Sequence, residues 1–384
     1  MTRLALNDVC LNICDGVHNT VIDTPNERYY LLSAKNIKDG SILVSSDERT
    51  ISLETFEKLR RRTKLSKGDV VITTVGTIGE VALIPDNNIN YEFQRSVGIL
   101  KPNPKIINAR FLKYVMQSSS MRTYLLNNAT GAAQPCLFIG FLKKVKIEFP
   151  ALSLQETIAS ILSAYDDLIE KNNRKIAILQ QMAEELYKEW FVRFRFPGYK
   201  TAKFKDGIPE GWQYVKLENI ANISTGKCNR EDAEEDGVYP LFDRSQEIRR
   251  SNSWLKDCEA IIVPGEGTSF IPRYYKGKFN LHQRCYCVEP KQGNIGFFLF
   301  QTLMMHRIYF LYVATGATVP SLRQTNFNNF KVLMPNKDLY ESYNRYSSNW
   351  YEAITVLEQQ NENLKTQRDL LLPRLMSGRL QVKA

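Results

Sequence analysis

The sequence predicts an α+β protein built from two copies of one half-molecule, each a mixed α/β domain followed by a long helix. Two observations support this fold: a stretch that occurs twice, and a heptad-like spacing of apolar residues after each copy. The stretch reads ATGAAQPCLFIGFLKKVKIEFP at 129–150 and ATGATVPSLRQTNFNNFKVLMP at 314–335, with eight of 22 positions identical. A repeat of this length indicates a duplicated domain.

The likeness continues upstream, at offsets that change because the loops differ in length. The Gln-Arg pair at 94–95 recurs at 283–284, and Gly16 recurs as Gly226. Short β-branched runs, DVVITTV and EVALI, flank the turn GTIG and predict strands, with EAIIVPG and RCYCV as their counterparts. Apolar spacing predicts helices at 108–126 and 296–313.

After each repeat, apolar residues follow a 4-3-4-3 spacing that is typical of a coiled-coil seam. The seam positions are Ile158, Leu162, Ile169, Asn172, Ile176, Leu179 and Leu186 in the first helix and Ile354, Leu357, Asn361, Leu364 and Leu371 in the second. Each seam contains one asparagine, which either fixes the register or lies at a wet edge. Each of these helices spans roughly 40 residues and is therefore about 60 Å long, at about 1.5 Å per residue. We expect them to pack antiparallel, with the halves related by a pseudo-twofold axis.

This organisation predicts four segments, with a boundary where Pro and Gly break the chain near 194–212. They are a first globular domain at 1–150, a central long helix at 151–197, a second globular domain at 198–335 and a C-terminal long helix at 336–384.

The net charge of +10 favours an anionic partner, nucleic acid first. Residues 151–190 carry a net of −3 and residues 336–384 a net of +1, so the remaining residues carry +12. The anion-attracting surface is therefore expected on the globular domains and not on the helices.

Basic and amide side chains near the predicted strand ends are the candidates for DNA contact, since arginine can bind phosphate or read guanine and glutamine can read adenine. The run RRRTKLSK at 60–67 and the run at 244–256 are expected at the same place, with Arg250 aligned to Arg60. The alternatives are a solvated basic face for the runs and a structural hydrogen bond at a strand end for the arginines of the Gln-Arg pairs. The candidates are Arg60, Arg61, Arg62, Lys64, Thr77, Gln94, Arg95, Gln134, Arg244, Arg249, Arg250, Arg273, Gln283, Arg284 and Arg323.

No catalytic constellation is found in the sequence. It contains no phosphate-binding loop, no GxGxxG motif and no Asp/Asn-Pro-Pro-aromatic tetrapeptide. The three histidines share no duplicated position, and Cys285 and Cys287 have no second pair to complete a zinc site. No apolar run reaches the roughly 18 residues of a membrane span. Seven scattered cysteines fit no disulfide framework, so a cytoplasmic location is expected.

The chain resembles the specificity subunit of type I restriction–modification systems. LSKGDVVITTVGTIGEVALI at 65–84 is similar to that family's strand-turn-strand signature. The segment from the first repeat to Leu162 is similar to its domain-to-helix junction, including Pro150, Leu152 and Gln155. The second half departs from the pattern, with Tyr340 in the place of Gln155 and GEGTSFIP in the place of GTIG.

The resemblance implies a non-catalytic subunit in which two target recognition domains each bind half of a bipartite double-stranded DNA site. The helices would set the spacer and dock two modification subunits, which would bind S-adenosylmethionine and methylate adenine. Motor and nuclease subunits would complete the complex, and this chain itself would need neither cofactor nor metal. Three alternatives are the specificity subunit of a type IIB-like system, a fused methyltransferase or nuclease, and a coiled-coil scaffold. The missing methyltransferase motifs oppose the second, and the +12 of the globular domains opposes the third.

Overall fold

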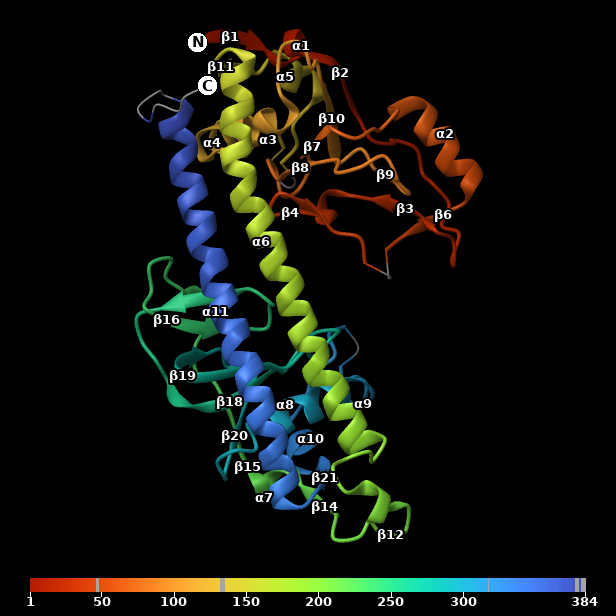
Figure 1. The fold of residues 1–384 in the computed structure, drawn as a ribbon, viewed down its shortest axis with the longest axis vertical. Helices are drawn as coiled ribbons and strands as arrows, with labels where there is room; N and C mark the ends of the chain where they lie inside the picture. The colour runs from red at the N-terminus through yellow and green to blue at the C-terminus, as the bar shows by residue number, and fades with distance from the viewer. Residues whose placement is uncertain (46–47, 132–134, 317, 377–379, 381–384) are drawn as a thin grey trace. The chain divides into compact units, whose positions relative to one another are not determined.

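The structure is a computed structural model, and it divides into two compact units. It describes residues 1–45, 48–131, 135–316, 318–376 and 380. Unit 1 comprises Met1–Asn172 and Gln359–Ala384, and unit 2 comprises Asn173–Glu358. Each unit holds one mixed α/β domain and part of two long helices, α6 (Leu152–Tyr187) and α11 (Lys337–Met376) (Figure 1). The predicted α+β fold class is confirmed.

The domain of unit 1 is built on two small sheets. A four-stranded sheet has the order β2-β10-β7-β8, and a three-stranded sheet has the order β6-β3-β9. Two further pairs are β1 with β11 and β4 with β5. The strands are β1 (Thr2–Ala5), β2 (Cys10–Asp15), β3 (Tyr29–Leu32), β4 (Ile37–Lys38), β5 (Ser41–Ile42), β6 (Thr50–Ile51), β7 (Val70–Thr73), β8 (Val81–Leu83), β9 (Tyr91–Phe93), β10 (Val97–Pro102) and β11 (Lys146–Phe149). The helices are α1 (Leu6–Val9), α2 (Leu53–Thr63), α3 (Ala109–Gln117), α4 (Ser119–Asn127) and α5 (Ile139–Lys144).

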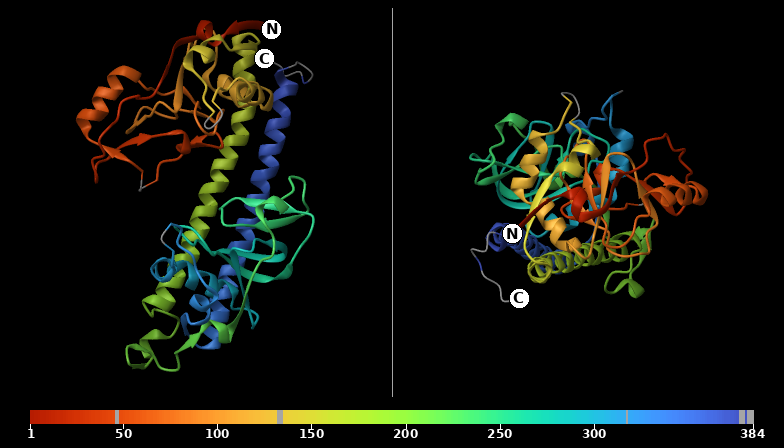
Figure 2. Two further views of the ribbon diagram at one scale, coloured as in Figure 1. Left: turned by 180° about the vertical axis from the view of Figure 1, so that it is seen from behind. Right: turned by 90° about the horizontal axis from the view of Figure 1, so that it is seen from above.

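The domain of unit 2 has one larger sheet of six strands, in the order β15-β20-β18-β19-β16-β17. Two pairs, β14 with β21 and β12 with β13, complete it. The strands are β12 (Phe204–Lys205), β13 (Ile208–Pro209), β14 (Gln213–Lys216), β15 (Ala221–Thr225), β16 (Tyr239–Phe242), β17 (Ile248–Ser251), β18 (Lys256–Pro264), β19 (Arg273–Leu281), β20 (Cys285–Pro290) and β21 (Lys331–Met334). The helices are α7 (Leu217–Ile220), α8 (Gly296–Met305), α9 (Arg307–Val313) and α10 (Gln324–Asn328). Figure 2 shows this sheet from behind.

Strand pairing reveals how the two domains correspond. In unit 1, β3 pairs with β9 in parallel and with β6 antiparallel, and in unit 2, β16 pairs in the same two ways with β19 and β17. Strand β19 pairs with both β18 and β16, whereas in unit 1 the equivalent pairings are made by two strands, β8 with β7 and β9 with β3. The two sheets of unit 1 are therefore one sheet in unit 2. The counterpart assigned to RCYCV was wrong: it forms β20, which pairs with β15 and β18 as β10 pairs with β2 and β7.

Both predicted domain helices exist, but each is broken into two. The first breaks at Ser118, whose hydroxyl accepts a hydrogen bond from the Met121 backbone and so caps α4. The second breaks at His306, which separates α8 from α9. In the described part of the chain, no helix combines the length and apolar character that a membrane crossing requires.

Within unit 1, α6 and α11 pack antiparallel through a mixed seam. Leu162 shares one core with Leu372 and Leu375. Asn172 Nδ2 donates to Asn361 Oδ1 at 3.0 Å, and the two residues are only 2% and 5% exposed. Burial argues against a wet edge and favours the interpretation that this pair fixes the register.

Within unit 2 the same two helices again run antiparallel, but aromatic rings fill the contact. Tyr187, the last residue of α6, and Trp190, in the π-helical turn Lys188–Val192 that follows it, both pack edge-on against Tyr343 of α11. The Tyr343 hydroxyl donates to the Ala183 carbonyl at 3.0 Å. All twelve predicted seam residues, taken over both units, are buried or half-buried.

The substitution of Tyr340 for Gln155 has a structural explanation. In unit 1 the buried Gln155 amide accepts from the Asn108 backbone and donates to the Ile106 and Pro150 carbonyls. In unit 2 Asn344, one turn after Tyr340, accepts from the Phe298 backbone and donates to two carbonyls. The same task, satisfying the backbone where the domain helix begins, has moved by one helical turn.

Candidate nucleic-acid interface

The described residues of the repeated stretch pair in the same way in both units, and we call them the repeated loop (129–131 with 135–137, and 314–316 with 318–322). In unit 1 the backbones of Thr130 and Cys136 exchange two hydrogen bonds of 3.0 and 2.8 Å, and in unit 2 those of Thr315 and Ser321 do so at 2.9 and 2.8 Å. Glycine follows the threonine in both copies, with positive φ of 103° at 131 and 126° at 316. The duplicated sequence therefore encodes the same backbone pairing across this loop in both units.

Each repeated loop is hydrogen-bonded to the turn that follows a central strand. The Leu137 backbone donates to the Thr74 carbonyl at 2.8 Å in unit 1. The Leu322 backbone donates to the Gly265 carbonyl at 2.8 Å in unit 2. The turn after β7 contains the exposed Thr77, and the turn after β18 contains Glu266.

The Gln-Arg pairs lie on the other side of the same turns. The Thr74 backbone donates to the Ser96 carbonyl at 2.8 Å, and the Gly265 backbone donates to the Arg284 carbonyl at 2.8 Å. Three segments thus lie side by side in each unit: the turn, the Gln-Arg pair and the repeated loop. We call the exposed surface of these segments, with the loops beside them, the recognition face of each unit.

A glycine on the preceding loop makes this arrangement possible. A Cβ built on Gly16 would overlap the carbonyl oxygen of Phe93, and one on Gly226 would overlap that of Leu281. Phe93 directly precedes Gln94, and Leu281 lies two residues before Gln283. The recurrence of Gly16 as Gly226 is therefore explained by a close backbone approach in both units.

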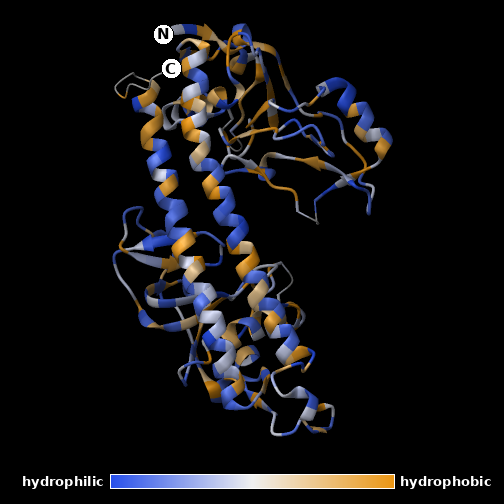
Figure 3. Cartoon of the chain, in the orientation of Figure 1, coloured by the Kyte–Doolittle hydropathy of each residue, from blue (hydrophilic) through white to orange (hydrophobic). Residues whose placement is uncertain are grey.

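The candidate residues of unit 1 fall into exposed and structural groups. Arg61, Lys64, Thr77 and Arg95 are exposed, and Gln94 is half-buried. Arg62 is also exposed, with Nη2 donating to the Asp15 carbonyl at 2.7 Å. Gln134 lies outside the described residues. Figure 3 shows α2, which carries Arg61 and Arg62, as a mainly hydrophilic helix.

Arg60 has a structural role. Its guanidinium donates to the Glu92 carboxylate and to the carbonyls of Ile89 and Tyr91, at 3.3 and 3.1 Å. Glu92 is fully buried, and burial raises its pKa while Arg60 and Thr63 act to lower it. Arg60 therefore neutralises an internal carboxylate.

The alignment of Arg60 with Arg250 was wrong. Arg60 lies in helix α2, whereas Arg250 lies on strand β17 opposite Pro240. Strand register matches Arg250 to Thr50 of β6, which lies opposite Tyr30. The spacing misled because unit 2 has no helix in the place of α2.

The candidate residues of unit 2 also divide into two groups. Arg273 donates to the Asp243 and Ser245 carbonyls at 2.6 and 2.9 Å and lies over the Phe242 ring, so its guanidinium is internal. Arg249 Nε pairs with Asp243 at 3.0 Å. The exposed members are Arg244, Arg250, Gln283, Arg284 and Arg323.

Glu266 is a functional candidate that the sequence reasoning missed. Its carboxylate lies 2.7 Å from Arg244 Nη1 and 2.9 Å from Arg284 Nη1. The only available signal was the acid in GEGTSFIP, at a turn where the first copy has GTIG.

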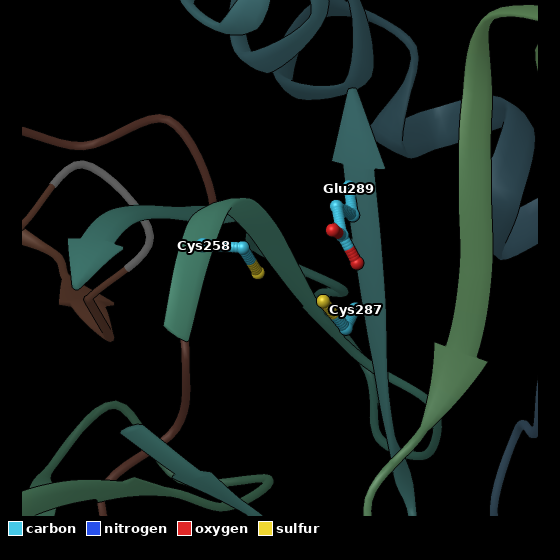
Figure 4. Close-up of side chains that lie close together, drawn as sticks. All are labelled: Cys258, Cys287 and Glu289. Carbon is cyan, nitrogen blue, oxygen red and sulfur yellow. The ribbon is translucent and has the colours of Figure 1, made fainter. Parts of the chain in front are cut away.

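One group of side chains in unit 2 has the composition of a metal site. Cys258 of β18 lies near Cys287 and Glu289 of β20 (Figure 4), with ligand atoms within 4.8 Å of one another. Lys256 Nζ already pairs with Glu289 at 3.0 Å. The hydrogen bond to Cys258, together with burial, raises the pKa of the Cys287 thiol far above its usual range. The same hydrogen bond lowers the pKa of Cys258. Because Lys256 already engages the carboxylate, we assign no metal to this group.

Comparison with known proteins agrees with this architecture. The family model described as "Type I restriction modification DNA specificity domain" matches residues 5–181 and 209–369. The MjaIX specificity subunit of Methanocaldococcus jannaschii is 25% identical over 382 residues, covering 89% of this chain and 84% of that protein. The EcoDI specificity subunit of Escherichia coli is 30% identical over 177 residues, covering 45% of this chain and 39% of that protein.

A solved structure shows the same fold. The S subunit of the type I restriction–modification system from M. genitalium superimposes with a TM-score of 0.57 at 17% identity, covering 97% of this chain and 95% of that one. The family match spans most of the chain and falls in two parts, as the duplication requires. The chain belongs to the family of type I restriction–modification DNA specificity subunits.

Proposed function

We propose that each unit reads one half of a bipartite double-stranded DNA site. The observation that carries this proposal is the recognition face, which is built twice from the same three backbone segments but carries different exposed side chains outside the Gln-Arg pair. A shared frame with divergent side chains suits two readers of different sequences. We assign the reading to residues 1–150 and 198–335, and the spacing to residues 151–197 and 336–384.

The exposed arginines and lysines divide by the contact they suit. Arg61 and Lys64 lie at and just after the C-terminal end of α2 and suit phosphate contacts, which position a protein without reading sequence. Arg95, Arg244 and Arg284 lie on the recognition faces and suit base contacts. The net +12 of the segments outside the long helices supports attraction to DNA.

We assign the chemistry to partner subunits. Two modification subunits would dock on α6 and α11, hold S-adenosylmethionine and methylate adenine in each half-site, and motor and nuclease subunits would cut unmethylated DNA. Exposed apolar residues on the helices support a docking surface there. They are Leu168, Ile178 and Met182 on α6 and Val356 and Leu370 on α11. This function requires a cytoplasmic location, where the DNA lies.

Methylome sequencing of the host with and without this gene tests the proposal. We expect one bipartite methylated motif to disappear when the gene is deleted. An unchanged methylome would refute the assignment. The purified chain mixed with S-adenosylmethionine and host DNA should transfer no methyl groups, and transfer by this polypeptide alone would show that it is an enzyme.

We further propose that the helices set the spacer between the half-sites. One base pair of B-DNA moves a half-site by about 3.4 Å and rotates it by about 35°. Four residues inserted after Asn172, about one helical turn, should leave both half-site sequences intact and shift or abolish the preferred spacer. The measurement is binding to duplexes with spacers of about four to nine base pairs at fixed salt, since phosphate contacts make affinity salt-dependent. A retained spacer optimum with parental affinity would exclude this role.

A further inference from the structure

A single carboxylate in unit 2 bridges two exposed arginines that come from different loops. Glu266 Oε2 accepts from Arg244 Nη1 at 2.7 Å, and Glu266 Oε1 lies 2.9 Å from Arg284 Nη1. The Glu266 side chain is 17% exposed, whereas the two arginines are 50% and 59% exposed. The acid is therefore held in the surface while both guanidiniums project from it.

The backbone fixes Glu266 before its side chain makes any contact. Its neighbour Gly265 donates to the Arg284 carbonyl, and Gly267 donates to the Pro320 carbonyl at 3.0 Å. A Cβ on Gly265 would lie 2.7 Å from the Arg284 carbonyl oxygen, so this close approach requires glycine. Glu266 also forms a β-bridge with Ser321 of the repeated loop. The carboxylate is thus built into the junction of the three segments.

Two other arginines of this surface, Arg249 and Arg273, support the loop and do not project from it. Arg249 pairs with the buried Asp243, and Arg273 binds the carbonyls on either side of Arg244. Burial alone would raise the pKa of Asp243, but hydrogen bonds from Ser245 and Arg249 hold it below its usual range. The Arg244 loop is therefore rigid at its base. A guanidinium has five N–H donors, so Arg244 and Arg284 retain donors beyond those directed at Glu266.

Unit 1 has no acid at the corresponding position. Val75 forms the β-bridge with Cys136 that Glu266 forms with Ser321. Among the described residues, the exposed Arg95 side chain has no ion-pair partner. The carboxylate is therefore not part of the shared frame, and it distinguishes the second recognition face from the first.

We propose that Glu266 is a positioning residue that holds Arg244 and Arg284 as a fixed pair for reading guanine in the second half-site. A carboxylate on a DNA-binding surface repels phosphate, so it weakens non-specific attraction. Its benefit lies in orientation, because bidentate recognition of guanine requires a guanidinium held in one plane. This inference rests on the proposed function, in which unit 2 reads one half-site.

The test compares sequence preference in Glu266→Ala and Glu266→Gln variants, each assembled with the modification subunits. The probes are a duplex carrying the motif found by methylome sequencing and a duplex with the second half-site scrambled. We expect the ratio of the two affinities to fall about tenfold in both variants, while affinity for the scrambled duplex stays equal or rises. Glu247→Gln is the matched control, since it removes the same charge from a glutamate of the Arg244 loop that is 78% exposed, and it should leave the ratio unchanged.

Adding Glu266→Ala to an Arg244→Ala/Arg284→Ala double variant should cause no further loss, because Glu266 acts through these two residues. Unchanged preference in both Glu266 variants, or a steeper salt dependence of binding without a change in preference, would overturn the inference. Failure of the parent complex to prefer its own motif would instead refute the proposed function. Unfolding temperatures of all variants separate these outcomes from misfolding.

Discussion

Unit 1 and unit 2 hold their α/β domains against the long helices with different chemistry. In unit 1 Asp166 of α6 accepts from Lys113 and Tyr114 of α3, at 2.9 and 2.7 Å, and from Arg368 of α11 at 2.6 Å. These groups are largely buried, so the anchor of unit 1 is a satisfied polar network.

Unit 2 places an aromatic residue at the same position of the repeat. Tyr351 of α11 is 185 residues after Asp166. Its ring stacks on Phe297 with centroids 4.5 Å apart, packs edge-on against Phe300 and lies 5.8 Å from the Tyr274 ring. The anchor of unit 2 is therefore a cluster of rings whose geometry stabilises it beyond area burial alone.

The difference teaches that the duplication preserves backbone constraints and leaves side-chain chemistry free to diverge. Gly16 and Gly226 meet the same close carbonyl, and both repeated loops make the same bonds. The anchors, by contrast, differ in their side-chain chemistry, and so do the recognition faces outside the recurring Gln-Arg pair. Constant frames with variable surfaces allow one architecture to read many sequences.

Replacing the glycines of the shared backbone frame, Gly16 and Gly226, should destabilise both units to the same extent. Gly16→Ala and Gly226→Ala should each lower the free energy of unfolding by about 4 kcal/mol, because Cβ would overlap a carbonyl that the strands hold in place. Gly140→Ala is the control, with no atom within 4 Å of its Cβ, and should be near neutral. Denaturant unfolding measures all three, and tolerance of either frame glycine variant would contradict the common-frame account.

Removing the Asp166 carboxylate from the polar anchor should cost more stability than the partial exposure of this side chain suggests. Asp166→Ala leaves Lys113 and Arg368 without their buried partner, so the free energy of unfolding should fall by about 3 kcal/mol. Asp167→Ala removes an exposed acid beside it and serves as the control. Equal stability of the two variants would show that the network is not a structural anchor.

Lowering the pH should destabilise the polar network around Asp166 in unit 1 but not the aromatic cluster around Tyr351 in unit 2. Burial alone would raise the pKa of Asp166, but Lys113 and the hydrogen bonds hold it below its ordinary value of 3.8. A depressed folded-state pKa contributes stability above the ordinary value and loses it as pH falls through the folded-state pKa. Tyr351 stays neutral throughout, because burial raises its pKa. The parent and Asp166→Asn proteins should therefore converge in unfolding free energy below about pH 4. Unfolding measured as a function of pH tests this. A difference in unfolding free energy that stays constant with pH would contradict the role of Asp166 as the ionised centre of the anchor.

The seam asparagines should show the smallest loss, and a loss that can be reversed. Asn172→Leu or Asn361→Leu alone leaves one buried amide facing an apolar side chain, at a cost of about 2 kcal/mol in unfolding free energy. The double leucine variant should recover or exceed parental stability but lose its specified register. A double-mutant cycle measures the coupling, and additive losses would show that the two side chains act independently.

Periodicity and repetition were readable from the sequence because they are local properties. The 4-3-4-3 spacing predicted residues that the structure buries along α6 and α11, and the repeat predicted two equivalent domains. The broken helices were missed because caps such as Ser118 depend on a single hydroxyl within an otherwise helical pattern.

The site was less predictable because its contacts join distant segments. Nothing in the spacing of Asn172 and Asn361 showed that their side chains would form a hydrogen bond. The sequence indicated a surface role for Arg60, because its partner, the buried Glu92, is distant in the sequence. Glu266 differed from the first copy, yet its two arginine partners come from other loops. Residue type alone could not separate Arg273, which supports a loop, from Arg244, which projects from it.

The most direct test of two separate readers is to exchange one of them. Residues 1–150 are replaced by the first recognition domain of another family member, and the methylated motif is determined by sequencing in cells that carry the modification subunits. The account predicts a new sequence in one half of the motif, with the other half and the spacer unchanged. A change in both halves, or in neither, would contradict it.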